Sequence, residues 1–184
     1  ITYAEWKARW PKWNSSIAAM NEKVKKRLPK KYHKKCKIVG DLMADISNEC
    51  NYSLEMKQER WIAILPGSKK TKLSIGVPFF LEMADHISSS SNNIKLMIPI
   101  APTTNIKDFL YYQSYKNPLA KNYSSKIKDI KILKESIFNY EIQTQKNTKI
   151  YLTSICPSYQ ILKQCELAIT TVGANTAELA AINL

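Results

Sequence analysis

The sequence is poor in the residue types that most metal and redox sites use. Its 184 residues include two histidines, His33 and His86, and four widely spaced cysteines that form no Cys-x-x-Cys pair. Zinc sites and dithiol redox motifs need closely spaced ligands of these types, so the composition disfavours both kinds of site. Free thiols in a reducing cytoplasm are the simpler interpretation, and we expect neither a metal nor a cofactor.

Long hydrophobic runs and internal repeats are also absent. No stretch approaches the roughly 18 consecutive apolar residues that a membrane-spanning helix needs. Hydrophobic residues nevertheless make up 45% of the chain, which is enough to fill one ordinary core and part of a second domain. We therefore expect a soluble, folded protein.

Acidic residues are scarce relative to basic ones. The chain has 28 Lys and Arg against 15 Asp and Glu, which gives a formal net charge of +13. Such an excess favours an anionic partner: nucleic acid, an acidic membrane surface or a phosphorylated small molecule. Because lysine enrichment is equally typical of compositional bias and of a solvated surface, charge alone does not choose among these partners.

From Trp61 onward, short apolar runs alternate with segments of helical spacing. Four runs have the composition of buried strands: Trp61–Leu65, Asn93–Ile100, Lys149–Ser154 and Glu166–Thr171. Helices are expected at Lys70–Ile87, Thr103–Tyr115 and Pro157–Gln164, and from Ala174 or Asn175 to Ile182. Pro78 is expected to divide the first of these helices. The alternation predicts an α/β fold, a Rossmann-like doubly wound parallel sheet.

The remaining segments are less regular. Residues 116–146 are interpreted as a loop with a short amphipathic segment. The chain before Trp61 begins with three tryptophans, Trp6, Trp10 and Trp13, and continues with a helical pattern through Ile17, Met20 and Val24. A basic run over 23–37, a strand candidate at Lys37–Val39 and a polar connector over 47–58 follow.

The chain ends in a predicted helix, whereas an alternating fold normally returns to its sheet, so we expect part of a longer protein.

The first strand-to-helix turn, "LPGSKK", combines a glycine, a hydroxyl and several lysines. Gly67 permits a tight turn, and the N-terminus of the following helix offers amide donors to an anion. Lys69, Lys70 and Lys72 would add full charges. The alternative needs no ligand: Ser68 caps the helix and the lysines form a solvated face. The spacing does not match a Walker loop.

The second turn, "TTVGANTAE", follows the last predicted strand. Gly173 permits close approach of a ligand, and the side chains of Asn175 and Thr176 suit phosphate oxygens. Glu178 suits the hydroxyls of a sugar. The alternative is again structural, because Asn175 and Glu178 have the spacing of a capping box.

Both turns are expected at the carboxyl edge of one parallel sheet, where ligands of such folds bind. Their joint occurrence predicts a site for a nucleotide diphosphate. The site is not a dinucleotide fingerprint, because the chain contains no Gly-x-Gly-x-x-Gly.

Several stretches resemble, in the same order, the lipid-A-disaccharide synthase family of bacterial glycosyltransferases: "VGDLMADI", "ILPGSKK", "VPFFLEMADHI", "IKLMIPIAPT" and "CELAITTVGANTAELAAINL". The family has the B-type architecture, in which two Rossmann-like domains face a cleft. The resemblance implies that 59–184 form most of the C-terminal domain, which binds the UDP-sugar donor. It also implies that 1–58 are the tail of the N-terminal acceptor domain plus the hinge.

The family resemblance also implies roles for single residues. Gly67, Ser68 and Lys69 would approach the diphosphate from one turn, and Gly173 and Thr176 from the other, while Glu178 would bind the ribose. The uracil would lie near Ser154–Pro157. The expected reaction transfers an acylated glucosamine to a sugar-phosphate acceptor, with a catalytic base outside this chain, so the chain alone is expected to be inactive.

Cellular placement follows from the same resemblance. It implies a cytoplasmic enzyme of lipid A biosynthesis, with the basic run at 23–37 resting on anionic headgroups or forming a solvated face. Oligomer formation is left open.

Three departures from the family pattern leave other functions open. Lys69 stands where the family has Arg, Asp41 and Leu42 replace His and Pro of a hinge motif, and two hydroxyl residues beside Gly173 are replaced by Val172 and Ala174. A non-catalytic paralogue that binds a UDP-sugar or a membrane surface fits these changes. A UDP-N-acetylglucosamine epimerase would use a similar donor domain. No nucleic acid is expected, because only the charge favours it.

Overall fold

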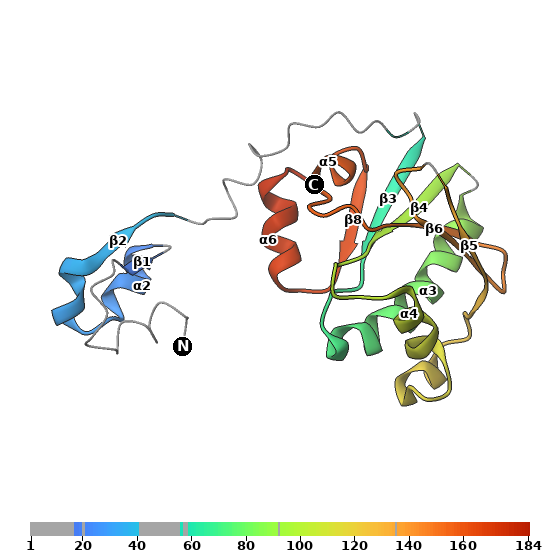
Figure 1. Ribbon diagram of the computed structural model, residues 1–184, viewed down its shortest axis with the longest axis horizontal. Coiled ribbons are helices and arrows are strands. Elements are labelled where there is room, and N and C mark those ends of the chain that lie inside the picture. The colour runs from blue at the N-terminus through green and yellow to red at the C-terminus, as the bar shows by residue number, and fades with distance from the viewer. Residues whose placement is uncertain (1–16, 20, 41–55, 57–58, 92, 135) are drawn as a thin grey trace. The chain divides into compact units, whose positions relative to one another are not determined.

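The computed structural model describes residues 17–19, 21–40, 56, 59–91, 93–134 and 136–184 (Figure 1). The chain divides into two compact units, Ile1–Glu49 and Cys50–Leu184, where the sequence suggested a boundary near residue 58. The predictions for the three tryptophans, for the hinge positions Asp41 and Leu42 and for most of the connector lie outside the described residues. None of the described helices has both the length and the apolar composition to cross a bilayer.

The N-terminal unit pairs two short parallel strands, β1 (Ile17–Ala19) and β2 (Cys36–Ile38). Between them lie α2 (Glu22–Lys26) and the 3-10 helix η1 (Lys30–Lys35). The helical pattern expected from Ile17 is wrong for β1. The helix begins only after Asn21, whose side chain accepts a hydrogen bond from Val24 N at 3.1 Å.

The basic run of the N-terminal unit is exposed to solvent for most of its length. Residues 21–40 contain nine Lys and Arg and one acidic residue, Glu22. None of these nine forms an ion pair within the part of the chain that the structure describes. Contact with anionic headgroups, expected from the sequence, stays a prediction.

The C-terminal unit is built on a six-stranded sheet with the order β5-β6-β7-β4-β3-β8. Its elements are β3 (Arg60–Leu65), α3 (Lys70–Ser90), β4 (Ile94–Pro99), α4 (Ile106–Gln113), η3 (Pro118–Asn122), β5 (Ile127–Ile132), β6 (Tyr140–Thr144), β7 (Lys149–Thr153), α5 (Tyr159–Leu162), β8 (Leu167–Thr170) and α6 (Ala174–Ala181). All four predicted strands are present, and the α/β prediction is confirmed.

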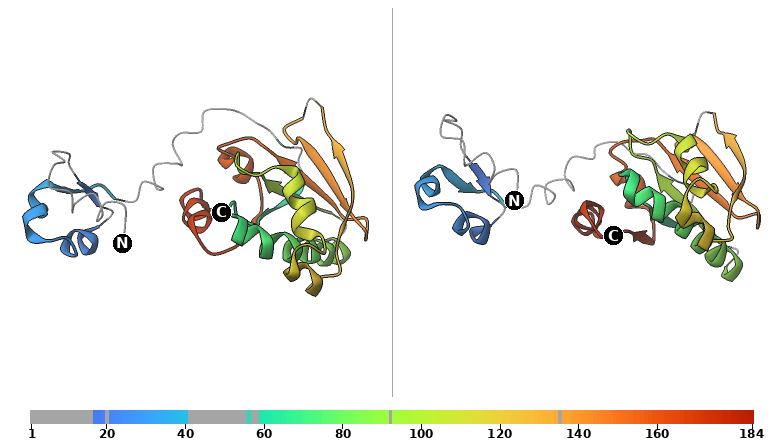
Figure 2. Two further views of the ribbon diagram at one scale, coloured as in Figure 1. Left: turned by 60° about the horizontal axis from the view of Figure 1, so that its bottom comes forward. Right: turned by 90° about the horizontal axis from the view of Figure 1, so that it is seen from below.

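The expectation of a wholly parallel sheet is wrong. β7, β4, β3 and β8 are parallel, but β6 runs antiparallel to both β5 and β7. The β5–β6 hairpin, drawn in orange in Figure 2, extends the sheet on the side away from α6. It occupies much of the segment 116–146 that was interpreted as a loop. β5 was missed because it is an exposed edge strand with lysines between its isoleucines.

Helices cover both faces of the sheet. On one face, Ile64, Leu96 and Ile150 belong to a buried cluster that also contains side chains of α3 and α4. Met97 points to the opposite face because side chains alternate along a strand. There its Sδ lies 3.6 Å from Sγ of Cys165, which follows α5. The C-terminal unit is therefore compatible with a Rossmann-like fold.

The strand order reverses between β3 and β8. The connections through α3 and α4 carry the chain from β3 to β4 and on toward β7, whereas the connection through α5 returns it across β4 and β3 to β8. In sheets of this kind the ligand crevice lies at the carboxyl ends of the two strands where the order reverses. These are the strands that precede the two glycine turns.

The helix α3 is continuous through Pro78, contrary to the expected division. Proline has no backbone N–H, so the carbonyl of Ser74 loses its usual partner four residues ahead. The side chain of Asn117 replaces that donor: its Nδ2 lies 2.7 Å from Ser74 O and 2.6 Å from Tyr112 O. Asn117 is buried, and it joins α3 to the end of α4.

Asn117→Ala should lower the free energy of unfolding by about 1–3 kcal/mol, because it leaves buried carbonyls without a donor. In a Pro78→Ala background the restored backbone N–H can donate to Ser74 O, so the same substitution should cost less. Urea unfolding of the four proteins of this double-mutant cycle measures the difference. An equal loss in both backgrounds would contradict the repair role of Asn117.

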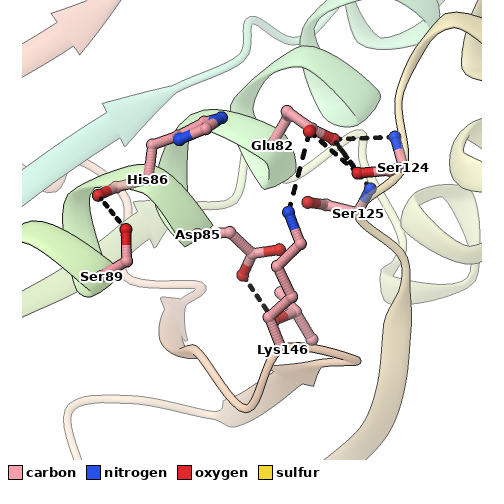
Figure 3. Close-up of polar contacts among 8 residues, drawn as sticks. Glu82, Asp85, His86, Ser89, Ser124, Ser125 and Lys146 are labelled. Atoms are coloured by element: carbon pink, nitrogen blue, oxygen red, sulfur yellow. Dashed lines mark hydrogen bonds and ion pairs between the residues drawn. The ribbon is translucent and has the colours of Figure 1, made fainter.

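Two carboxylates of α3 hold the two ends of the β5–β6 hairpin (Figure 3). Glu82 accepts hydrogen bonds from Ser124 N and Ser125 N, both at 2.8 Å. Asp85 accepts one from Thr144 Oγ1 at 2.6 Å. The backbone bond from Ser125 is the largest of the effects that lower the pKa of Glu82 from 4.5 to about 2, and the bonds from Ser124 add to it.

Glu82→Gln should lower the free energy of unfolding by about 1–3 kcal/mol at neutral pH, because the bonds to the charged carboxylate are lost. The pKa is lower in the folded chain than in the unfolded chain. The stabilisation is therefore complete above pH 4.5 and is lost as the pH falls toward 2. Urea unfolding at a series of pH values should show the difference from wild type shrinking over that window.

Glu59→Gln is the control for this experiment, because the carboxylate of Glu59 has only a 3.8 Å contact with Lys95. It should change the free energy of unfolding by less than about 0.5 kcal/mol at every pH. A Glu82→Gln difference that stayed constant down to the acid end of the series would show that the carboxylate is not stabilised by these bonds.

Candidate functional site

A cavity of about 250 Å³ lies at the carboxyl ends of β3 and β4. It is bounded by the two glycine turns, the segment after β4, and the loop between β7 and α5. The lining residues are Leu65, Pro66, Gly67, Ser68, Pro99, Ile100, Ala101, Pro102, Ile155, Cys156, Pro157, Ser158, Tyr159, Leu162, Asn175 and Glu178. Segments that are far apart in the sequence thus meet at the carboxyl edge of the sheet, next to the point between β3 and β8 where the strand order reverses.

Four of the eight predicted site residues line this cavity: Gly67, Ser68, Asn175 and Glu178. Lys69, Ser154, Gly173 and Thr176 do not line it. Lys69 precedes the first residue of α3 and is exposed. The backbone N–H of Ser154 donates to Asn139 Oδ1 at 2.6 Å, and the side chain is exposed.

The turn between β3 and α3 is tight, as predicted, but its serine does not cap the helix. Gly67 has φ +95°, in the left-handed region, and a β-carbon there would lie 3.0 Å from Cβ of Lys72. The helix begins at Lys70 after Lys69, which provides no side-chain cap. Ser68 is exposed and lines the cavity, and the first amides of α3 lack a side-chain acceptor.

A glycine inside α3 sets the distance between the helix and this turn. A β-carbon on Gly76 would lie 2.7 Å from the carbonyl oxygen of Pro66. The helix therefore packs directly against the backbone of the turn. Nothing in the local sequence marked this glycine, because its role depends on a contact with a residue in the preceding turn.

The turn between β8 and α6 uses a different cap from the expected one. The helix begins at Ala174, and Thr176 Oγ1 accepts a hydrogen bond from Gly173 N at 3.2 Å. The capping box of Asn175 with Glu178 is therefore wrong. No hydrogen bond is recorded for either of these side chains among the described residues, so both remain available to a ligand in the cavity.

Lys72 joins the two turns. Its Nζ donates a hydrogen bond to the carbonyl of Val172, and the same atom lies 2.6 Å from the position of a β-carbon on Gly173. Nearby Thr171 Oγ1 is buried and has no hydrogen-bond partner in the described part of the chain. The sequence showed Lys72 only as one charge in a cluster. The position of Lys72 in the first turn of the predicted helix could have indicated this contact, because helical side chains lean back toward the N-terminus.

The loop between β7 and α5 supplies the third side of the cavity. It contains a cis peptide bond between Cys156 and Pro157. The sequence placed this region near a uracil through Ser154–Pro157. In the structure the lining begins one residue later, at Ile155, and continues to Tyr159. The exposed Cys156 was not singled out from the sequence.

The cavity offers hydrogen-bonding groups and one charged side chain, but few metal ligands. Among its lining residues, Glu178 is the one carboxylate and Cys156 the one thiol. Within the described residues, no group of three or more His, Cys, Asp and Glu side chains is placed to hold a metal ion. The lining that the structure describes contains no Lys or Arg, so any attraction for an anion would come from backbone amides and helix dipoles rather than from a lining cation.

No family model matches this chain, and a search of curated proteins gave no match. The likeness to the lipid-A-disaccharide synthase family therefore depends on the motifs themselves.

The cysteines of the C-terminal unit should differ sharply in reactivity. Cys156 is exposed at the cavity, whereas burial raises the pKa of Cys165 to about 12. In a Cys50→Ser background, iodoacetamide should alkylate Cys156 first, as followed by peptide mass spectrometry. Urea-unfolded protein is the control, in which both thiols react at similar rates. Equal alkylation of Cys165 in the folded protein would contradict this arrangement.

Proposed function

We propose that the cavity binds the UDP part of a sugar nucleotide, and that the chain is the donor-binding part of a glycosyltransferase related to lipid-A-disaccharide synthase. The observation that carries the proposal is the meeting of two turns. Gly67 and Ser68 from one turn, and Asn175 and Glu178 from the other, line one cavity where the strand order reverses. This is the position at which open α/β sheets bind nucleotides.

The diphosphate is assigned to the space between the two helix N-termini. Helix N-termini attract anions through their unpaired amides and the helix dipole. α3 has no side-chain cap, so its first amides are open to phosphate oxygens. The hydroxyl of Ser68 and the amide of Asn175 add neutral donors at the same edge.

The sugar and base are assigned to the remaining walls. Glu178 is half-buried, and its carboxylate is an acceptor for the two hydroxyl groups of a ribose. The loop from Ile155 to Tyr159 offers apolar surface and backbone groups to a pyrimidine. A volume of about 250 Å³ is below the usual range for a whole ligand site, which is about 300–1,000 Å³. We therefore assign the cavity to the nucleotide and place the acceptor outside it.

The proposed chemistry is transfer of a glycosyl group. An acceptor hydroxyl attacks the anomeric carbon, the bond from that carbon to the diphosphate oxygen breaks, and UDP leaves with the bonding electrons. Helix N-termini and lysines stabilise the charge that develops on UDP. The proton of the attacking hydroxyl goes to a base that this chain is not proposed to supply.

Calorimetric titration with UDP tests the proposal. Glu178→Ala should weaken UDP binding about 10- to 100-fold, because a hydrogen bond to a charged group contributes about 1.5–3 kcal/mol. Glu59→Ala is the matched control, since Glu59 belongs to the same unit but does not line the cavity, and it should bind UDP like wild type.

Two results would contradict the proposed function. One is an absence of UDP binding by the wild-type chain, above all if salt-sensitive binding to RNA is found instead. The other is equal weakening by Glu178→Ala and Glu59→Ala.

A further inference from the structure

We infer that Lys72 is the residue that makes the site selective for a diphosphate, by placing its ammonium group between the two glycine turns. This inference depends on the proposed function, because it concerns which part of the nucleotide the site recognises. The sequence offered Lys72 only as one of three lysines that add charge at the first turn, and the family resemblance gave it no role. The role follows from its position in the structure.

The first argument is the unused hydrogen-bonding capacity of Lys72. Its side chain is half-buried, and a lysine ammonium has three N–H donors. One donates to the carbonyl of Val172, and no other hydrogen bond or ion pair of Lys72 is recorded in the described residues. Two donors therefore remain for an anion that approaches the junction of the turns.

The second argument is that the ammonium of Lys72 lies where a positive charge is electrostatically unfavourable. Cations are stabilised at the C-termini of helices, whereas Lys72 lies in the first turn of α3 and contacts the residues that lead into α6. Neither helix has an acidic residue in its first turn. Three positive features, the two helix N-termini and the ammonium, thus lie close together. Glu178, the one carboxylate that lines the cavity, forms no ion pair with Lys72 in the described part of the chain. A diphosphate would neutralise them.

The third argument is the room that the glycines provide. A β-carbon on Gly67 would lie 3.0 Å from Cβ of Lys72, and one on Gly173 would lie 2.6 Å from its Nζ. Both glycines therefore leave space for the lysine, and Gly67 also lines the cavity. The stem of Lys72 lies directly behind the wall that the phosphate would contact. Lys72 does not itself line the cavity, so the inference requires its flexible stem to rotate and carry the ammonium from Val172 toward the ligand.

Comparison of UDP with uridine separates charge recognition from simple support of the turns. Lys72→Met keeps the apolar stem and removes the donors, and Lys72→Gln keeps a neutral donor. Both should lower the affinity for UDP about tenfold or more. Neither should change the affinity for uridine, measured by ligand-observed NMR, by more than about threefold. Lys107→Met is the control, because Lys107 is an exposed lysine in the first turn of α4 and does not line the cavity.

Each outcome decides the inference. A selective loss of UDP affinity in the Lys72 variants, with Lys107→Met like wild type, supports it. Equal losses for UDP and uridine would show that Lys72 only supports the turns, and unchanged UDP binding would show that it has no role; either result overturns the inference and leaves the proposed function standing. A wild-type chain that binds no UDP overturns both. Thermal melting confirms that the variants are folded, and Lys72→Gln decides the matter if Lys72→Met does not fold.

Discussion

The parallel pairing of β3 with β8 is the constraint on which the rest of the account depends. Ile62 to Leu65 pair in register with Leu167 to Thr170, so the two strands end at the same edge and at the same level. The turns that follow them are thereby brought together although a hundred residues separate them. The backbone hydrogen bonds of the sheet already bring residues of both turns to one cavity, so no side chain of either turn needs to reach far.

The site is built largely from groups that remain unpaired. Ser68 does not cap α3, and Asn175 and Glu178 do not form a capping box, so these polar side chains face the cavity. Around them the structure is held firmly: Gly76 lets α3 pack on the backbone of Pro66, and Asn117 supplies the donor that Pro78 lacks. A rigid frame that carries open donors is what preorganised recognition of an anion requires.

Much of the parallel core could be predicted from the sequence, because strands buried on both faces appear as short apolar runs. The β5–β6 hairpin could not. β5 alternates isoleucine with charged residues and is exposed, so its signal is that of a surface loop. Only part of the site could be predicted, because the sequence shows local patterns but not contacts between distant residues. Glycine and helix-start patterns mark the turns, but which side chain caps each helix, and which lysine bridges them, depends on contacts such as that of Lys72 with Val172.

The most direct test of the central claim is an NMR titration of the ¹⁵N-labelled chain with UDP, following the backbone amides of the two turns. The account predicts that the amides of Gly67 and Ser68 and those of Asn175 and Thr176 shift together, with one dissociation constant. A response confined to one turn, or the two turns responding with different constants, would contradict the claim that they form a single site.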